Sequence, residues 1–197
     1  MAVPTEALLE VALDDGQRLA GTFVAPASQP PHPAVLLLNG SGPLDRDSNQ
    51  PGQVLDIAKT LARAFGERGI ASTRFDKRGV RESTGDYLST GFDRETADAA
   101  AALAALRAHP EVDSGRVVVL GHSVGATIAM RLGAEAGLAG VVLLAGAAVR
   151  GDEVLRRQIA SYQKQLREPT APEVVTEVVD WVATVTHAES MRDGRSG

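Results

Sequence analysis

The chain has 197 residues, of which 44% are hydrophobic and 23% are charged, a balance typical of a soluble globular protein with one sizeable core. Its formal net charge of −5 and its lack of a dense Lys/Arg patch argue against a nucleic-acid partner. The absence of cysteine excludes disulfides, thiolate zinc sites and a cysteine nucleophile. No two of the four histidines have the spacing of metal ligands, so we expect no metal site.

The sequence also argues against a membrane partner. Residues 1–10 carry acidic side chains and no apolar signal core. The longest fully apolar stretch, residues 141–149, is too short to span a bilayer. We therefore expect a cytoplasmic protein.

The first predicted element is a β-hairpin. Residues 7–13 and 19–24 alternate loosely between apolar and polar side chains, and an Asp-Gly pair, typical of a hairpin turn, lies between them. The proline-rich segment 26–33 then predicts a surface connection in which His32 is exposed. Residues 34–38 form a continuous apolar run, which is typical of a strand buried on both faces.

Helical and strand patterns alternate from there on. We expect a helix over 53–68, a strand over 70–75, a helix over 92–108, a strand over 116–120, a helix ending near 136 and a strand over 141–145. Such alternation implies βαβ units and a mainly parallel sheet, whose ligands bind beyond the carboxyl ends of the strands. Residues 39–47, 76–83 and 121–125 fall at that edge.

The pattern changes after Gly146. An amphipathic helix over 151–166 and a second helix over 172–186 follow, with no strand after them, which is typical of an insertion over a site. We therefore divide the chain into a partial core over 1–147, a helical cap segment over 148–190 and a frayed tail over 191–197.

The segment Gly121-His122-Ser123-Val124-Gly125 has the form G-x-S-x-G. It follows an apolar strand and precedes a helical pattern, the context of a nucleophile elbow that exposes a serine hydroxyl above the sheet. Glycine two positions before and after the serine leaves room where a Cβ would collide with the backbone. The helix start places partial positive charge near a developing oxyanion. The alternative is an ordinary strand-to-helix turn.

Three segments together resemble the α/β-hydrolase superfamily, specifically its bacterial serine esterase-like members. Residues 38–47, LNGSGPLDRD, resemble the family's oxyanion loop after the third strand, although Asn39 stands where many members have histidine. Residues 74–83, RFDKRGVRES, resemble the loop after the fourth strand, and the elbow is the third segment. The resemblance implies an α/β fold: a mostly parallel sheet opened by an antiparallel hairpin, with the C-terminal strands missing and a two-helix cap fragment at the end.

The resemblance also implies a chemistry. Ser123 is expected to be the nucleophile, the backbone N–H groups of Ser41 and Val124 to form the oxyanion hole, and Gly121, His122 and Gly125 to support the elbow. The expected reaction is hydrolysis of carboxylic ester or thioester bonds in a small-molecule acyl substrate, without a cofactor. A peptidase or an acyltransferase on the same fold would share every one of these motifs.

The family's triad runs in the order Ser, Asp or Glu, His, and we expect its acid and base to be absent from this chain. His122 adjoins Ser123, but its side chain is expected to point away. His187 is interpreted as a solvent-facing residue, and Asp152 as a helix N-terminal acid, with a displaced triad acid as the alternative. Because serine without a base is a weak nucleophile, we expect almost no activity from the chain alone.

Charged residues in the loops are interpreted as structural. Asp76 and Arg78 are expected to pair with each other, and Asp45, Arg46 and Asp47 to order the first loop, with chemistry or substrate contact as the alternatives.

The strand over 141–145 is apolar on both faces, yet it is the last one expected and would lie at a sheet edge, which invites self-association. We therefore expect residues 1–197 to be a fragment or a prematurely terminated form; a soluble, cooperatively unfolding monomer would contradict this. The missing triad histidine favours a second hypothesis, a non-catalytic binding protein that reuses the hydrolase core.

Overall fold

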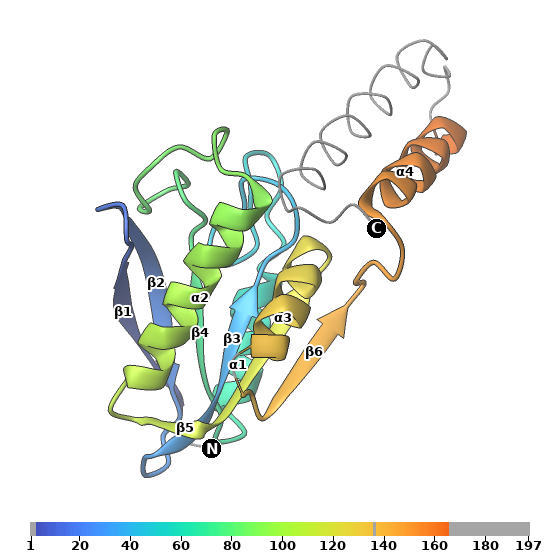
Figure 1. Ribbon diagram of the computed structural model, residues 1–197. Helices are drawn as coiled ribbons and strands as arrows, with labels where there is room; N and C mark the ends of the chain where they lie inside the picture. Colours follow the sequence, from blue (N-terminus) through green and yellow to red (C-terminus); the bar gives the residue numbers. More distant parts are fainter. Residues whose placement is uncertain (1–2, 136, 166–197) are drawn as a thin grey trace. The chain divides into compact units, whose positions relative to one another are not determined.

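The computed structural model describes residues 3–135 and 137–165, in two compact units, Met1–Gly146 and Ala147–Gly197. The elements in chain order are β1 (Thr5–Ala12), β2 (Arg18–Ala25), β3 (His32–Leu38), α1 (Ile57–Gly66), β4 (Ala71–Phe75), α2 (Phe92–Ala108), β5 (Val112–His122), α3 (Val124–Glu135), β6 (Gly140–Leu144) and α4 (Gly151–Gln165). Within the described residues the strands form one six-stranded sheet in the order β1-β2-β4-β3-β5-β6 (Figure 1).

The sheet is antiparallel at its N-terminal side and parallel elsewhere. β1 and β2 form the predicted hairpin, with Thr5 opposite Ala25 and Ala12 opposite Arg18, and Gly16 in the turn has a φ of 79°. β2 also pairs antiparallel with β4. β4, β3, β5 and β6 then pair parallel to their neighbours. The expected mostly parallel sheet opened by a hairpin is therefore confirmed.

Helices cover both faces of the sheet. α2 and α3 pack on one face, where Leu103 and Ile128 belong to the larger hydrophobic cluster, and α1 packs on the other face through Ala58 and Ala62 (Figure 1). β3 contributes alternate residues to both clusters, which confirms that this strand is buried on both sides. The parallel strands are thus held in the interior of three layers, and their carboxyl ends all reach the same edge.

The helix predicted over 53–68 begins later than expected, at Ile57. The side-chain oxygen of Asn49 accepts hydrogen bonds from the N–H groups of Leu55 and Asp56, at 2.7 and 2.9 Å. Asp56 itself has a left-handed backbone, with a φ of 50°. The backbone before Ile57 is therefore committed to the preceding loop, and the helix cannot extend through it.

The prediction that His32 is exposed was wrong, because its side chain is only 2% exposed. β3 begins at His32, before the apolar run, and the His32 N–H donates to the carbonyl of Glu111 at 2.8 Å. β5 likewise begins at Val112 rather than at residue 116, and Val112 lies opposite His32. Backbone pairing thus makes both strands begin before the apolar runs from which they were predicted.

β6 is the edge strand of the described sheet, as expected. Its large apolar side chains remain between 36% and 44% exposed, namely Val141, Val142, Leu143 and Leu144. Self-association through this edge stays a prediction. The first helix expected after residue 146 is present as α4, whereas the predicted helix over 172–186 and the tail over 191–197 lie outside the described residues. No helix of the described chain has the length and apolar character needed to cross a membrane.

Candidate active site

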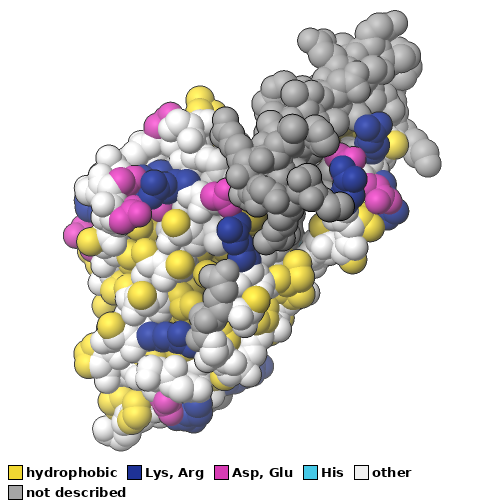
Figure 2. All heavy atoms as spheres, in the orientation of Figure 1, with side chains coloured by type: hydrophobic (Ala, Val, Ile, Leu, Met, Phe, Trp, Pro, Cys, Tyr) yellow, Lys and Arg dark blue, Asp and Glu magenta, His cyan; other side chains and the backbone are white. Residues whose placement is uncertain are grey.

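The carboxyl ends of β3, β4 and β5 bring three segments to one edge of the sheet. These segments are the loop over residues 39–56, the loop over residues 76–91 and the turn at Ser123 (Figure 1). Figure 2 shows that basic and acidic side chains lie next to one another at the end of the molecule where the two loops are found. The candidate site is therefore built from a backbone turn and two highly charged loops.

The turn has the sharpness predicted for an elbow. β5 ends at His122 and α3 begins at Val124, so Ser123 alone joins strand to helix. Its φ is 54°, in the left-handed region that non-glycine residues seldom adopt. The Ser123 N–H donates to the Leu144 carbonyl at 2.9 Å, and the Ser123 carbonyl accepts from the Ala126 N–H at 3.0 Å. These two bonds hold the strained residue in place.

The glycines of the turn are required by close backbone contacts. A Cβ on Gly121 would overlap the carbonyl of Gly125. A Cβ on Gly125 would lie 2.5 Å from the carbonyl oxygens of both Leu38 and Asn39. Only glycine allows α3 to begin this close to the end of β3. The elbow is thereby pressed directly against the start of the loop after β3.

Gly40 allows the loop after β3 to approach Ser123 closely. A Cβ on Gly40 would lie 3.2 Å from Ser123 Cβ and 3.0 Å from His122 Nδ1, so the peptide that joins Gly40 to Ser41 lies beside Ser123. The Ser41 N–H has no acceptor among the described residues. The Val124 N–H is at the first position of α3, where a helix provides no acceptor. The N–H groups of Ser41 and Val124 thus both belong to segments that adjoin Ser123.

A base for the serine is not found in the described part of the chain, where no side chain forms a hydrogen bond to Ser123 Oγ. The exposed His122 ring lies against Gly40 instead. Asp152 lies in the first turn of α4, where Arg150 donates to it at 3.2 Å, and His187 lies outside the described residues. The same described residues contain no cluster of His, Asp or Glu that could hold a metal ion.

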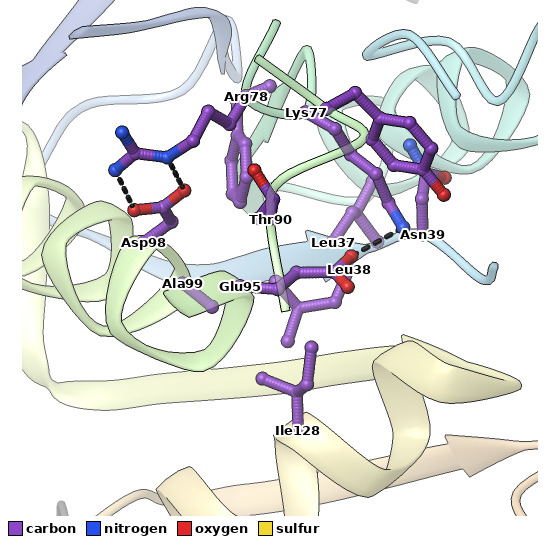
Figure 3. Close-up of a pocket in the computed structure, with 12 residues that line it drawn as sticks. Leu37, Leu38, Asn39, Lys77, Arg78, Thr90, Glu95, Asp98, Ala99 and Ile128 are labelled. Atoms are coloured by element: carbon purple, nitrogen blue, oxygen red, sulfur yellow. Dashed lines mark hydrogen bonds and ion pairs between the residues drawn. The ribbon is translucent and has the colours of Figure 1, made fainter. Parts of the chain in front are cut away.

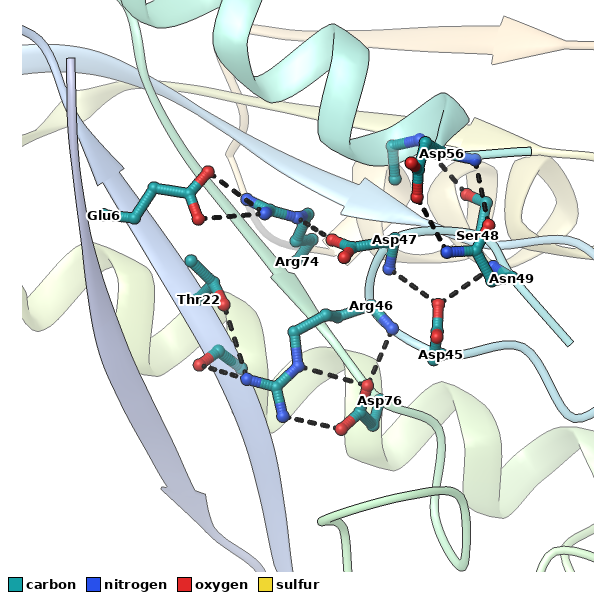
Figure 4. A network of polar contacts seen from close by, with 12 residues as sticks. Glu6, Thr22, Asp45, Arg46, Asp47, Ser48, Asn49, Asp56, Arg74 and Asp76 are labelled. Carbon is teal, nitrogen blue, oxygen red and sulfur yellow. Dashed lines mark hydrogen bonds and ion pairs between the residues drawn. The ribbon is translucent and has the colours of Figure 1, made fainter. Parts of the chain in front are cut away.

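Charged side chains order the loop after β3, as predicted. The Asp45 carboxylate accepts hydrogen bonds from the N–H groups of Asp47 and Asn49 at 3.0 and 2.9 Å (Figure 4), and it pairs with Arg81 at 2.8 Å. The Asn39 side chain donates to the Asp45 carbonyl at 2.8 Å. Asn39 at the start of the loop is therefore tied to Asp45 near its middle.

The expected pair between Asp76 and Arg78 was wrong. The fully buried Asp76 carboxylate accepts two hydrogen bonds from the Arg46 guanidinium, of 2.6 and 3.1 Å, and a third from the Arg46 backbone N–H at 2.8 Å (Figure 4). The first two bonds, ahead of the charge on Asp76, raise the pKa of the Arg46 guanidinium. Arg78 instead binds Asp98 on α2 through bonds of 2.7 and 2.9 Å, with both side chains buried (Figure 3). Each partner comes from a different element, which the spacing of residues along the chain does not reveal.

A third buried cation joins the loop to the hairpin. Arg74, 2% exposed at the end of β4, donates to Asp47 at 2.8 Å and to Glu6 on β1 at 3.2 Å (Figure 4). A guanidinium this deeply buried is tolerated only when carboxylates compensate its lost hydration. The loop after β3 is therefore anchored by separate ion pairs to β4 and to the loop after β4, and Arg74 continues the connection to β1.

The sequence analysis did not identify three residues that lie near the site, namely Lys77, Tyr87 and Glu95. Lys77 Nζ forms an ion pair with Glu95 on α2 (Figure 3) and donates to the Gly40 carbonyl at 2.6 Å. It lies 6.0 Å from the centre of the Tyr87 ring. Burial, and secondarily the Glu95 charge, raise the pKa of the Tyr87 phenol. A lysine directly after a strand that ends at the site edge was the available signal.

A small cavity lies below these residues, between β3, α2 and the loop after β4. Its lining includes Asn39, Lys77, Tyr87 and Glu95 but not Ser123 (Figure 3). Its volume for the centres of water-sized molecules is about 20 Å³, close to the minimum needed for one buried water.

Comparison with known proteins gives a consistent result. A family model described as "Serine aminopeptidase, S33" (Hydrolase_4) matches residues 53–192. The esterase EstD of Thermotoga maritima is 32% identical over 146 residues, which are 74% of this chain and 34% of that protein. An uncharacterized protein of Mycobacterium tuberculosis is 32% identical over 133 residues, which are 68% of this chain and 43% of its own. The chain thus spans less than half the length of these relatives.

Solved structures share the fold. The esterase Pf2001 of Pyrococcus furiosus superimposes with a TM-score of 0.65 at 21% identity, over 90% of this chain and 64% of that one. The α/β hydrolase GrgF of a Penicillium species gives a TM-score of 0.65 at 19% identity, over 98% of this chain and 68% of its own. At such identities the likeness concerns the fold alone, and it confirms the sheet type expected from the sequence.

Proposed function

This chain belongs to the α/β-hydrolase superfamily, and from that premise we propose that it supplies the nucleophile and the oxyanion hole of a serine hydrolase that cleaves carboxylic esters or thioesters. The observation that carries the proposal is the strained Ser123, whose φ is 54° and whose Cβ would lie 3.2 Å from a Cβ on Gly40. Strain of this kind persists where the surrounding structure enforces it, and it is concentrated at active sites.

In the proposed reaction Ser123 Oγ attacks the acyl carbonyl carbon and its proton passes to a base. The carbonyl oxygen becomes an oxyanion, which the N–H groups of Ser41 and Val124 stabilise by hydrogen bonds. Each such donor lowers the barrier by about 3 kcal/mol. The alcohol or thiol then leaves with a proton, and water cleaves the acyl-serine in a second step. The partial positive charge at the start of α3 favours the same oxyanion.

The base is the part of the mechanism that the described residues do not supply. Loss of the histidine from a catalytic triad lowers turnover by about 10⁶ relative to the intact enzyme. The oxyanion hole and substrate binding still leave the reaction about 10³ to 10⁴ times faster than in water. We therefore propose that the 197-residue chain hydrolyses esters very slowly by itself. Imidazole added at high concentration is expected to act as a substitute base and to raise the rate that depends on Ser123.

A fluorophosphonate probe tests this proposal, because it reacts covalently with activated serines. We expect labelling of the chain to rise with imidazole and to be lost in Ser123→Ala. Ser114→Ala is the matched control, because Ser114 is an exposed serine in β5 and distant in sequence from the elbow. Equal labelling of the wild type and Ser123→Ala, with and without imidazole, would refute the catalytic role and favour a binding protein on the same core.

A peptidase is the second candidate, favoured by the description of the matching family model as a serine aminopeptidase. An elbow with an oxyanion hole serves amide and ester substrates alike, so the choice between them depends on the rest of the substrate site. A p-nitrophenyl ester and an aminoacyl p-nitroanilide, compared under the same imidazole rescue, distinguish them. Turnover of the ester alone supports the esterase, whereas comparable turnover of the anilide supports the peptidase.

A further inference from the structure

The Lys77 side chain is buried, which is unusual for a lysine and suggests a specific role. Its side chain is 7% exposed, whereas Lys59, the other lysine whose side chain the structure describes, is exposed. Removing an ammonium group from water costs several kcal/mol unless its partners compensate. Glu95, in the first turn of α2, supplies the compensating charge. The remaining partner, the Gly40 carbonyl at 2.6 Å, is a group of the oxyanion loop itself.

The Gly40 carbonyl and the Ser41 N–H are the two ends of one peptide group. This peptide is trans, so its C=O and N–H point in opposite directions. A cation fixed at the carbonyl end therefore also fixes the direction of the N–H at the other end. No other hydrogen bond to the Gly40 carbonyl is found in the described part of the chain.

The same contact changes the strength of the donor. Hydrogen bonds in series polarise one another, and a charged donor on the carbonyl draws electron density away from the amide nitrogen. The Ser41 N–H then carries more positive charge and binds an oxyanion more tightly. Burial of Lys77 at the end of β4 increases this effect, because the surrounding medium screens the charge weakly.

We propose that Lys77 is a positioning residue of the oxyanion hole, which orients and polarises the Ser41 N–H through its hydrogen bond to the Gly40 carbonyl. Lys77 touches neither the substrate nor the reacting atoms. The proposal rests on the proposed function of Ser123 and Ser41, but it also makes a statement about the resting protein. In the protein without substrate, the charge on Lys77 already polarises the Ser41 amide.

The test compares Lys77→Met with the wild type and with Lys59→Met, which removes an exposed positive charge as a matched control. In ¹⁵N-labelled protein, Lys77→Met is expected to move the Ser41 amide resonance upfield and Lys59→Met to leave it unchanged. The rate of fluorophosphonate labelling with imidazole is expected to fall about 10- to 100-fold in Lys77→Met alone. With a turnover substrate, kcat falls while KM stays constant, which loss of loop structure would not produce.

Lys77→Gln is the second variant, because it keeps a neutral donor and is better tolerated should Lys77→Met not fold. It is expected to give intermediate effects on both the Ser41 resonance and the labelling rate. An unchanged Ser41 resonance in the Lys77 variants would overturn the proposal, as would an unchanged labelling rate in a wild type that reacts. A wild type that never reacts while the Ser41 resonance responds would instead refute the proposed function and leave only the structural contact.

Discussion

The elbow and the loop after β3 meet at Ser123, but they are held by different interactions. The elbow depends on backbone hydrogen bonds to Ser123 and on glycines that permit close approach at residues 121 and 125. The loop over residues 39–56 depends instead on ion pairs with Arg74, Arg81 and Asp76, which come from other parts of the chain, and each pair has at least one buried partner.

Because of this difference, we expect the two regions to respond differently to amino-acid substitutions. A turn held by backbone contacts fails when a single Cβ is added, since the backbone around it cannot move aside. A loop held by ion pairs fails when a charge is left buried without its partner, but it tolerates replacement of both partners by apolar groups. The following predictions test this distinction, from the largest expected effect to the smallest.

Gly125→Ala is expected to destabilise the protein by more than about 4 kcal/mol or to prevent folding. Its Cβ would lie 2.5 Å from two carbonyl oxygens, neither of which can move without disrupting the end of β3. Urea unfolding followed by circular dichroism measures the loss. Gly115→Ala in β5 is the control, because the nearest atom to its Cβ is at 3.4 Å, and it should stay near wild-type stability. Similar unfolding midpoints for the two variants would contradict a backbone-held elbow.

Arg78→Met is expected to cost about 3–5 kcal/mol, because it leaves the Asp98 carboxylate buried without its bidentate partner. The double variant Arg78→Met/Asp98→Leu should recover much of that stability. The control is Arg94→Met, whose pair with Asp14 is exposed and is worth less than about 1 kcal/mol. A double variant that is no more stable than Arg78→Met would show that lost packing, rather than an unpaired charge, dominates.

Ser123→Gly is expected to stabilise the fold by about 1 kcal/mol while removing all chemistry that depends on the serine. A side chain at a φ of 54° costs about 1–2 kcal/mol, which glycine avoids, although glycine loses more backbone entropy on folding. Ser123→Ala retains a Cβ at the same φ and should show no such gain. Equal unfolding midpoints for the two variants would indicate that Ser123 is not strained.

Asp113→Asn, far from the site edge, gives the smallest expected effect. The hydrogen bond from Arg116, followed by the Gly115 N–H, lowers the pKa of Asp113 below its ordinary value of 3.8. A carboxylate with a lowered pKa stabilises the fold at pH values above 3.8, and the contribution is lost as pH falls through its folded-state pKa. The wild type should therefore be slightly more stable than Asp113→Asn at pH 7, and the difference should shrink as the pH falls below 3.8. A difference independent of pH would contradict this assignment.

Much of the fold could be predicted because its signals are local. α2 spans Phe92–Ala108, the range that its composition and Pro110 predicted, and the elbow follows from five consecutive residues. The errors arose where distant groups intervene. The start of α1 is set by the side chain of Asn49, and the burial of His32 by pairing with β5.

The candidate site divides in the same way. Ser123 was found because an elbow needs particular residue types at adjacent positions, whereas the ion-pair partners of Asp76, Arg78 and Lys77 lie between 18 and 63 positions away. Nothing in the spacing of charges states which cation meets which carboxylate. The geometry of the sheet decides it, since that geometry sets which loops come together.

By itself, the sequence determined the alternation of strands and helices, the hairpin, the elbow and the identity of the candidate nucleophile. These properties follow from backbone and side-chain chemistry within a few residues. Only the tertiary structure decided that a buried lysine two residues after β4 donates to the Gly40 carbonyl, next to the proposed oxyanion donor, and that Arg78 binds Asp98 on α2. The reason is burial: a charge removed from water needs a compensating partner nearby in space, and that partner can lie anywhere along the chain.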